Sequence, residues 1–192
     1  MRDAGVGRVL LASLHQGIAD ILPTRLGFYE SWLHAKGLRD GTIDLAPLYA
    51  VLSFLRQEGG PTYKKVTTSA GEYAAEWTVE SMGSFERWML KVAPDWIRNR
   101  LVLRLADRLV HASYRRSRLT SKLRKHVAAL DLQESVFCDV REPVDHPLCG
   151  FYTAAFVRLF ALFNVPATIE TTSCRATGGR TCAMTVTIET GA

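Results

Sequence analysis

The chain has 192 residues, of which 47% are hydrophobic, and its formal net charge is +5. This size and composition suffice for one sizeable core, and no repeat or linker divides the sequence, so residues 1–192 are expected to form a single domain. His15, Gln16 and Asp20 interrupt the apolar start, and no later stretch is long enough to span a bilayer. The composition argues against a secreted or membrane-spanning protein and predicts a cytoplasmic one.

The first two-thirds of the chain show the periodicity of amphipathic helices, up to about Leu130. Asp44 is expected to cap the second helix, the Gly-Gly-Pro run at 59–61 to end it, and Pro94 to precede the fourth. The four apolar stripes consist of Leu10, Leu14, Ile18 and Leu22; of Leu48, Leu52 and Leu55; of Tyr63, Val66, Ala70, Tyr73 and Trp77; and of Ile97, Leu101, Leu105 and Leu109.

The positive charge is concentrated in one segment, Arg98 to Lys125, which holds ten Lys or Arg residues against a single acid, Asp107. Such a segment suits nucleic acid, anionic lipid headgroups or a carboxylated ligand, and it is also typical of a solvated helix face. No zinc-finger spacing, basic zipper or basic stretch interleaved with aromatic residues is present, which argues against a nucleic-acid partner.

The last third of the chain changes its pattern. Residues 134–141, with Val136, Cys138 and Val140 alternating, predict a strand. The nearly all-apolar residues 147–163 predict a central buried helix with Pro147 in its first turn. Two β-branched runs, 166–173 and 182–189, then flank a glycine-containing turn and predict a hairpin. This order favours an α+β fold in which the helical section packs with a small antiparallel sheet.

Four cysteines lie in this last third, and two of them, Cys174 and Cys182, are eight residues apart across the hairpin turn. In a reducing compartment they are expected to be metal ligands or free thiols, although the even number also permits two disulfides. Free cysteines commonly pack in a core as small hydrophobic residues. The spacing alone leaves these three interpretations open.

Residues 136–188 resemble the 4-vinyl reductase domain family. The resemblance rests on a cysteine that opens a helix, Cys149, and on the Cys-Arg-Ala-x-Gly-x-x-x-Cys hairpin from Cys174 to Cys182. The His-Pro-x-Cys start and the helix after it are most similar to the stand-alone accessory proteins of bacteriochlorophyll synthesis. Related domains serve as ligand sensors in phenol-responsive transcription activators, and core subunits of the TRAPP vesicle-tethering complexes share the fold.

The resemblance implies a structural zinc site, which in metal-binding family members uses the three motif cysteines and a glutamate three residues before the second one. The corresponding ligands here are Cys149, Cys174 and Cys182, but position 171 is threonine. Glu170 takes the fourth place if a bulge turns its side chain around, because neighbouring strand residues face opposite sides. His146 and Cys138 are the alternative fourth ligands.

The sequence favours a binding protein over an enzyme, because no flavin, nicotinamide or iron–sulfur motif accompanies the family resemblance. We therefore expect a tetrapyrrole or aromatic ligand, a homodimer built on helical faces and a partner enzyme or signalling partner. Reduction of a vinyl group on a chlorophyll precursor is the alternative function, and a dimeric scaffold is a further one. No catalytic residue is predicted. The predicted ligand-binding residues are Phe151, Tyr152, Phe156 and Phe160, together with Arg104, Arg108 and His111 as partners of carboxylates or of a chlorin magnesium.

Overall fold

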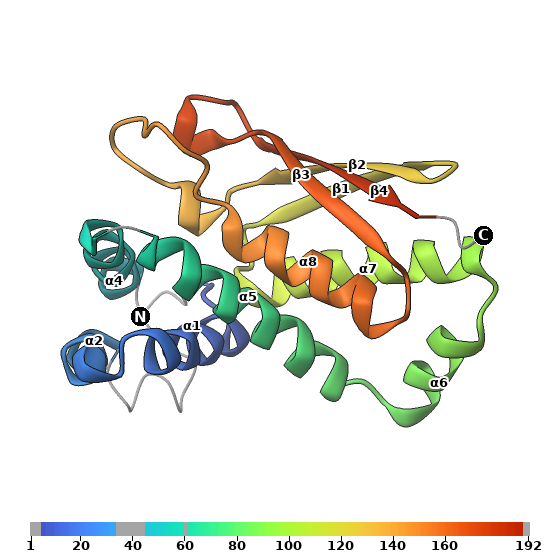
Figure 1. Ribbon diagram of the computed structural model, residues 1–192, viewed down its shortest axis with the longest axis horizontal. Coiled ribbons are helices and arrows are strands. Elements are labelled where there is room, and N and C mark those ends of the chain that lie inside the picture. Colours follow the sequence, from blue (N-terminus) through green and yellow to red (C-terminus); the bar gives the residue numbers. More distant parts are fainter. Residues whose placement is uncertain (1–4, 34–44, 60, 190–192) are drawn as a thin grey trace.

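The computed structural model describes residues 5–33, 45–59 and 61–189. Helices form the first part of the chain, with one short 3-10 helix among them, and the sheet, one further helix and two more 3-10 helices follow (Figure 1). The helices are α1 (Arg8–Ile21), α2 (Leu26–Leu33), α4 (Leu45–Gln57), α5 (Thr62–Glu80), α6 (Ser84–Val92), α7 (Asp95–Ser113) and α8 (Gly150–Leu162). The strands are β1 (Arg118–Arg124), β2 (Val127–Gln133), β3 (Ala167–Ser173) and β4 (Cys182–Ile188), and the 3-10 helices are η1 (Pro23–Arg25), η2 (Val136–Cys138) and η3 (Arg175–Thr177).

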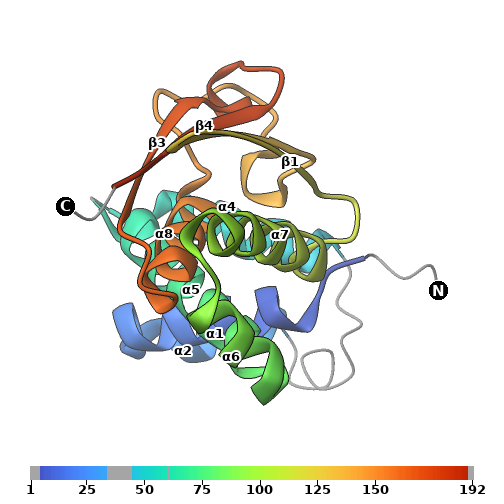
Figure 2. The same ribbon diagram turned by 90° about the vertical axis from the view of Figure 1, so that its right-hand side faces the viewer.

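The four strands form one antiparallel sheet in the order β1-β2-β4-β3. Figure 2 shows this sheet lying over α7 and α8, with α5 and α1 on the far side of those helices. Along β4, Met184, Val186 and Ile188 are buried against the helices, whereas Thr187 points to solvent. This alternation is expected for a sheet with one covered face. The predicted α+β class is therefore confirmed.

The helical stripes expected from the sequence are largely the buried stripes of the structure. Leu10, Leu14 and Ile18 of α1 are fully buried, as are Leu48 and the rest of its stripe in α4. Asp44, the predicted cap, lies outside the described residues. No helix in the described ranges is long and apolar enough to cross a bilayer.

Helix α5 packs between α1 and α8 through small residues. A Cβ atom added at Gly71 would lie 2.2 Å from the Phe151 carbonyl oxygen of α8, so only glycine allows the two helices to come this close. Gly17 plays the same part between α1 and α5, since its Cβ would lie 2.7 Å from the Val66 oxygen. Close packing of this kind fixes the position of α8, and with it the start of the cysteine motif.

Three boundary predictions were wrong. The helical section ends at Ser113 rather than near Leu130, because a hairpin of β1 and β2 follows. Its two-residue turn has Lys125 at a φ of 54°, and no glycine, asparagine or proline marks it. The predicted strand around Cys138 is the 3-10 helix η2, and Pro147 precedes α8, which begins at Gly150.

We expect Gly71→Ala to lower the free energy of unfolding by about 1–3 kcal/mol, because the new methyl group must push α8 away from α5. Gly27→Ala is the matched control: Gly27 lies in α2 with nothing near its Cβ position. The control should be neutral or stabilise by up to about 1 kcal/mol. Chemical denaturation of both variants measures the difference, and an unchanged midpoint for Gly71→Ala would contradict the packing argument.

Candidate metal centre and adjoining cavity

All four cysteines of the chain meet at one point. Their Sγ atoms lie within 4.8 Å of one another, and all four side chains are buried. The Cys138 and Cys174 sulfurs are 3.5 Å apart, and those of Cys174 and Cys182 are 3.9 Å apart. These separations are too long for disulfides, whose sulfurs lie about 2.05 Å apart. The cysteines are free, which leaves the metal and buried-thiol interpretations.

The separations match a tetrahedral ion. With Zn–S bonds of about 2.3 Å, the sulfurs of a tetrahedral zinc site lie about 3.8 Å apart. Four soft thiolate donors are a typical set for zinc, whereas an iron–sulfur cluster places its own atoms between the cysteine sulfurs and spreads them further. The four residues therefore fit a single zinc ion.

Each sulfur is brought in by the end of a different element. Cys138 ends η2, Cys149 is the N-cap residue of α8, Cys174 lies between β3 and η3, and Cys182 begins β4. At the ends of helices and strands, some backbone N–H groups have no hydrogen-bond partner within the element. One such group, the Arg175 N–H, points to the Cys182 sulfur at 3.5 Å. A metal there would join four separate parts of the chain.

The two glycines of the hairpin turn let the second pair of cysteines approach. Gly178 has a φ of 91°, which side chains disfavour. A Cβ at Gly179 would lie 2.4 Å from the Ser173 Oγ and 2.8 Å from the Cys174 oxygen, and the Gly179 N–H donates to that oxygen at 2.9 Å. The turn therefore folds back tightly onto Cys174.

A polar network outside the cluster orients the same loops. Asp139, next to Cys138, accepts a hydrogen bond from the Tyr49 hydroxyl of α4 at 2.7 Å. It also faces Arg175, with a nitrogen–oxygen distance of 3.5 Å. The carboxylate thus links the chain beside Cys138 to the chain beside Cys174, as partners of metal ligands commonly do.

The four thiols differ in their pKa values, because they are hydrogen-bonded to one another in a buried site. Hydrogen bonds from Cys138, Cys149 and Cys182 hold the pKa of the Cys174 thiol well below its ordinary value. Hydrogen bonding to Cys149, together with burial, raises the pKa of Cys138 far above its ordinary value. At least one sulfur is thus favoured as a thiolate, which is the form that binds a metal.

The structure separates the predicted fourth ligands. Cys138 lies in the cluster, whereas Glu170 is exposed on the outer side of β3 and His146 is exposed beside Asp145. The β-bulge expected in this stretch exists, between Thr171 and Ser173. It comes after Glu170, so Thr171 instead faces inward, with its Oγ1 atom 3.7 Å from the Cys149 sulfur. The structure therefore places Glu170 outside the cluster, and among the predicted fourth ligands it favours Cys138.

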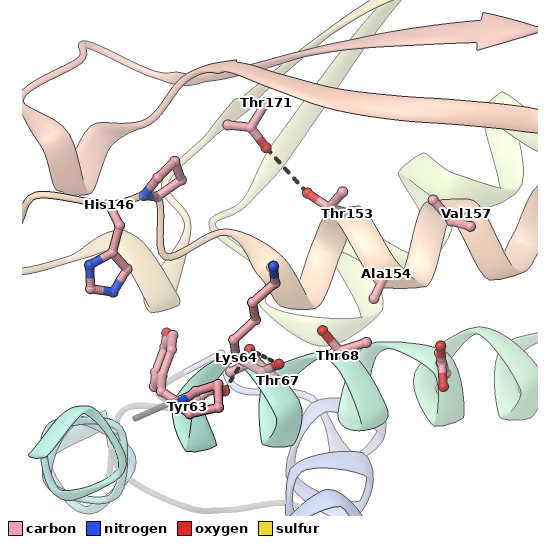
Figure 3. Close-up of a pocket in the computed structure, with 13 residues that line it drawn as sticks. Tyr63, Lys64, Thr67, Thr68, His146, Thr153, Ala154, Val157 and Thr171 are labelled. Atoms are coloured by element: carbon pink, nitrogen blue, oxygen red, sulfur yellow. Dashed lines mark hydrogen bonds between the residues drawn. The ribbon is translucent and has the colours of Figure 1, made fainter. Parts of the chain in front are cut away.

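A cavity of about 700 Å³ opens beside the cysteines, between α5, α8 and the edge strand β3 (Figure 3). In Figure 3 the Lys64 amino group rises from α5 toward α8, and His146 closes one end. From α5 the lining residues are Tyr63, Lys64, Thr67, Thr68 and Glu72, and from α8 they are Gly150, Thr153, Ala154 and Val157. Thr171, His146, Pro147 and Pro61 complete the lining.

Thr171 links the cavity to the cluster. Its hydroxyl lies 3.4 Å from that of Thr153, which in turn donates to the Cys149 carbonyl oxygen at 3.3 Å. The Tyr63 hydroxyl donates to the Leu148 oxygen at 3.3 Å, and burial raises its pKa, so it stays a neutral donor. The residues that line the cavity thus contact the segment that carries Cys149.

The predicted ligand-binding residues are not brought together. The four aromatic residues of α8 are in the core, where Phe137 stacks on Phe151 with ring centres 4.6 Å apart. The cavity uses the other side of α8, where Gly150, Ala154 and Val157 recur at helical spacing. That small-residue stripe was visible in the sequence. Arg104 and Arg108 line a different groove, between α6 and α7, and His111 is exposed on α7.

No family model matches the chain, and no curated protein matches it. Solved structures share its fold. An H-NOX protein from S. oneidensis in the Fe(II)NO ligation state is 12% identical, with 96% of this chain and 100% of that chain covered and a TM-score of 0.61. The phenol-responsive sensory domain of the transcription activator PoxR, with phenol, is 13% identical, with coverage of 76% and 75% and a TM-score of 0.53. At these identities the likeness establishes the α+β fold alone.

We expect Cys138→Ser to weaken zinc binding by more than about 100-fold and to lower the melting temperature, because the site loses a ligand whose binding energy contributes to folding. Glu170→Gln is the control, since its side chain is exposed outside the cluster. Elemental analysis and a competition titration with a chromogenic chelator measure both. Full zinc content in Cys138→Ser combined with loss in Glu170→Gln would restore the glutamate as the fourth ligand.

Proposed function

We propose that this protein is a small-molecule-binding module of the sensory or carrier type, whose cavity between α5 and α8 is supported by a structural four-cysteine zinc site. The main observation that supports this proposal is the cavity next to the cysteine cluster. Its volume of about 700 Å³ is typical of small-molecule sites, which combine apolar walls with a few polar groups. A zinc site with four protein sulfurs has no open position for catalysis, so the metal supports the walls.

The lining indicates the kind of ligand. Ala154, Val157 and Pro147 offer apolar contact, and four threonine hydroxyls offer hydrogen bonds. Lys64 supplies a positive charge within the cavity. This combination suits a ring compound with a hydroxyl or carboxylate group. The fold that the chain shares with a phenol-responsive sensory domain supports the same class of ligand.

The resemblance to the 4-vinyl reductase domain family makes a tetrapyrrole the other class of ligand, with an accessory role in bacteriochlorophyll synthesis. Packing favours the smaller compound. Helices α5 and α8 are in backbone contact at Gly71, beside the cavity wall, so a rigid macrocycle would have to part them. We therefore propose a single aromatic ring as the primary ligand and use a chlorin as the competing probe.

Phenol, benzoate and divinyl chlorophyllide are the probes for this proposal, with binding measured by isothermal titration calorimetry. Val157→Trp should abolish binding of the ring compounds, because the indole fills the cavity. Ala161→Trp, one turn further along α8 and exposed outside this cavity, should bind as the wild type does. Binding of none of the three probes at millimolar concentration would overturn the proposal. Vinyl reduction by the pure protein with reduced nicotinamide would favour the enzyme instead.

Lys64→Gln should weaken benzoate binding about tenfold or more while changing phenol binding less than about threefold. Only the carboxylate gains a charge-assisted hydrogen bond from the amino group. Lys65→Gln is the matched control, since Lys65 is exposed on the next position of α5 and does not line the cavity. If both variants weakened the binding of benzoate and of phenol by the same factor, the cause would be a general charge effect rather than a contact with Lys64.

A homodimer through helical faces stays a prediction. Helix α2 exposes two large apolar side chains, Phe28 and Trp32. Dimerisation would bury such side chains. Light scattering at tens of micromolar should report twice the mass of the chain, and a monomer at every concentration up to that range would contradict it.

A further inference from the structure

Helix α6 and the start of α7 carry an apolar ridge that the described chain leaves largely exposed. Five of the nine large apolar side chains that the described residues expose belong to it. In α6 they recur at i, i+3, i+4 and i+7 and so share one face. Only Leu90 of α6 is buried. The ridge consists of Phe85 (72% exposed), Trp88 (57%), Met89 (46%), Val92 (56%) and Trp96 (64%).

Positive charges surround this apolar ridge. Two arginines nearby are neutralised, since Arg108 pairs with Glu86 at 3.1 Å and Arg98 pairs with Asp95 at 2.7 Å. Others have no ion pair within the described ranges, and one of them, Arg100, lies over the Trp96 ring at 5.8 Å. These unpaired cations are Arg87, Lys91, Arg100 and Arg104.

A narrow groove runs between the two helices beside the ridge. It measures about 330 Å³, and apolar side chains of both helices line it, among them Phe85, Met89 and Leu105. Arg104 and Arg108 lie at the same groove. An apolar slot with a free guanidinium group beside it suits an acyl chain whose anionic headgroup meets the arginine.

We propose that the α6–α7 ridge docks the protein peripherally on an anionic lipid bilayer. This inference stands apart from the ligand cavity, because Figure 1 places α6 at the edge of the molecule, away from the turn between β3 and β4 and from the loop before α8. Tryptophan and other apolar side chains on one helix face, with lysine and arginine around them, are typical of helices that lie in the bilayer interface.

Charge selects the bilayer over a second copy of the chain. In a symmetric pair of ridges, the four free cations of one copy would lie close to the same four cations of the other copy and repel them. An anionic membrane surface instead attracts every one of them. It also accepts the aromatic side chains without a matching pocket.

The test is flotation of the full chain with vesicles of phosphatidylcholine containing 30% phosphatidylglycerol, compared with phosphatidylcholine alone. We expect binding to the anionic vesicles, with a blue shift of tryptophan emission as Trp88 and Trp96 leave water. Phe85→Ser with Trp88→Ser should reduce binding more than tenfold. Arg100→Gln with Arg104→Gln should reduce it about 20-fold, and raised salt should have the same effect.

Matched controls separate the ridge from general effects. Trp32→Ser removes an exposed aromatic residue of α2, and Arg141→Gln with Arg180→Gln removes two exposed charges near the cysteine loops. Both should bind vesicles as the wild type does, and circular dichroism checks that every variant is folded. Failure of the wild type to bind anionic vesicles at low salt would overturn the proposal. Dimerisation that Phe85→Ser with Trp88→Ser abolishes, without vesicle binding, would assign the ridge to a second copy instead.

Discussion

The close approach of α5 to its two neighbouring helices determines where everything else in the molecule can lie. Gly17 and Gly71 let the backbones of α1, α5 and α8 touch where any side chain would collide. With α8 held in this way, its aromatic face packs under the sheet and its small-residue face remains toward α5. The start of α8 then reaches both the sheet, where the Cys149 sulfur lies near Thr171, and the cavity, which Gly150 lines.

The cysteine cluster and the cavity form one unit. Four loop segments meet at the sulfurs, and the Tyr49 to Asp139 to Arg175 network holds the same segments from outside. Thr171 contacts Cys149 on one side and Thr153 of the cavity wall on the other. A bound zinc ion would therefore hold the cavity wall in place. A ligand in the cavity would in turn contact Thr171 and Thr153, which adjoin Cys149.

The basic segment of the sequence takes on a different meaning in the folded chain. Half of its arginines lie on α7, and the remainder lie on β1 and the connection before it, so the segment is not one helix face. Arg104 and Arg108 line the groove between α6 and α7, whereas the four aromatic residues of α8 are buried in the core. Their neighbours are instead the apolar side chains of α6, and that neighbourhood makes a surface function more natural than recognition of a buried ligand.

The sequence by itself determined the helices with strong 3.6-residue periodicity, the last hairpin with its glycine turn, the α+β class and the three motif cysteines. Each of these depends on residues close together in the chain. Local patterns misled where tertiary contacts override them. Val136, Phe137 and Cys138 read as a strand, yet all three are buried in a 3-10 turn. The β1–β2 hairpin lacks a turn residue that would mark it.

Only the tertiary structure decided the fourth cysteine, the cavity and the exposed apolar ridge. Cys138 meets Cys174 across 36 positions of sequence, and a β-bulge that follows Glu170 leaves that carboxylate outside. The cavity runs alongside the contact of α5 and α8 at Gly71, where the two helices face Thr171 of β3. Whether an apolar helix face is buried depends on what packs against it, and the described chain leaves the face of α6 with Phe85 and Trp88 largely exposed. All three features depend on distances between segments that are far apart in the sequence, and a local sequence pattern contains no information about such distances.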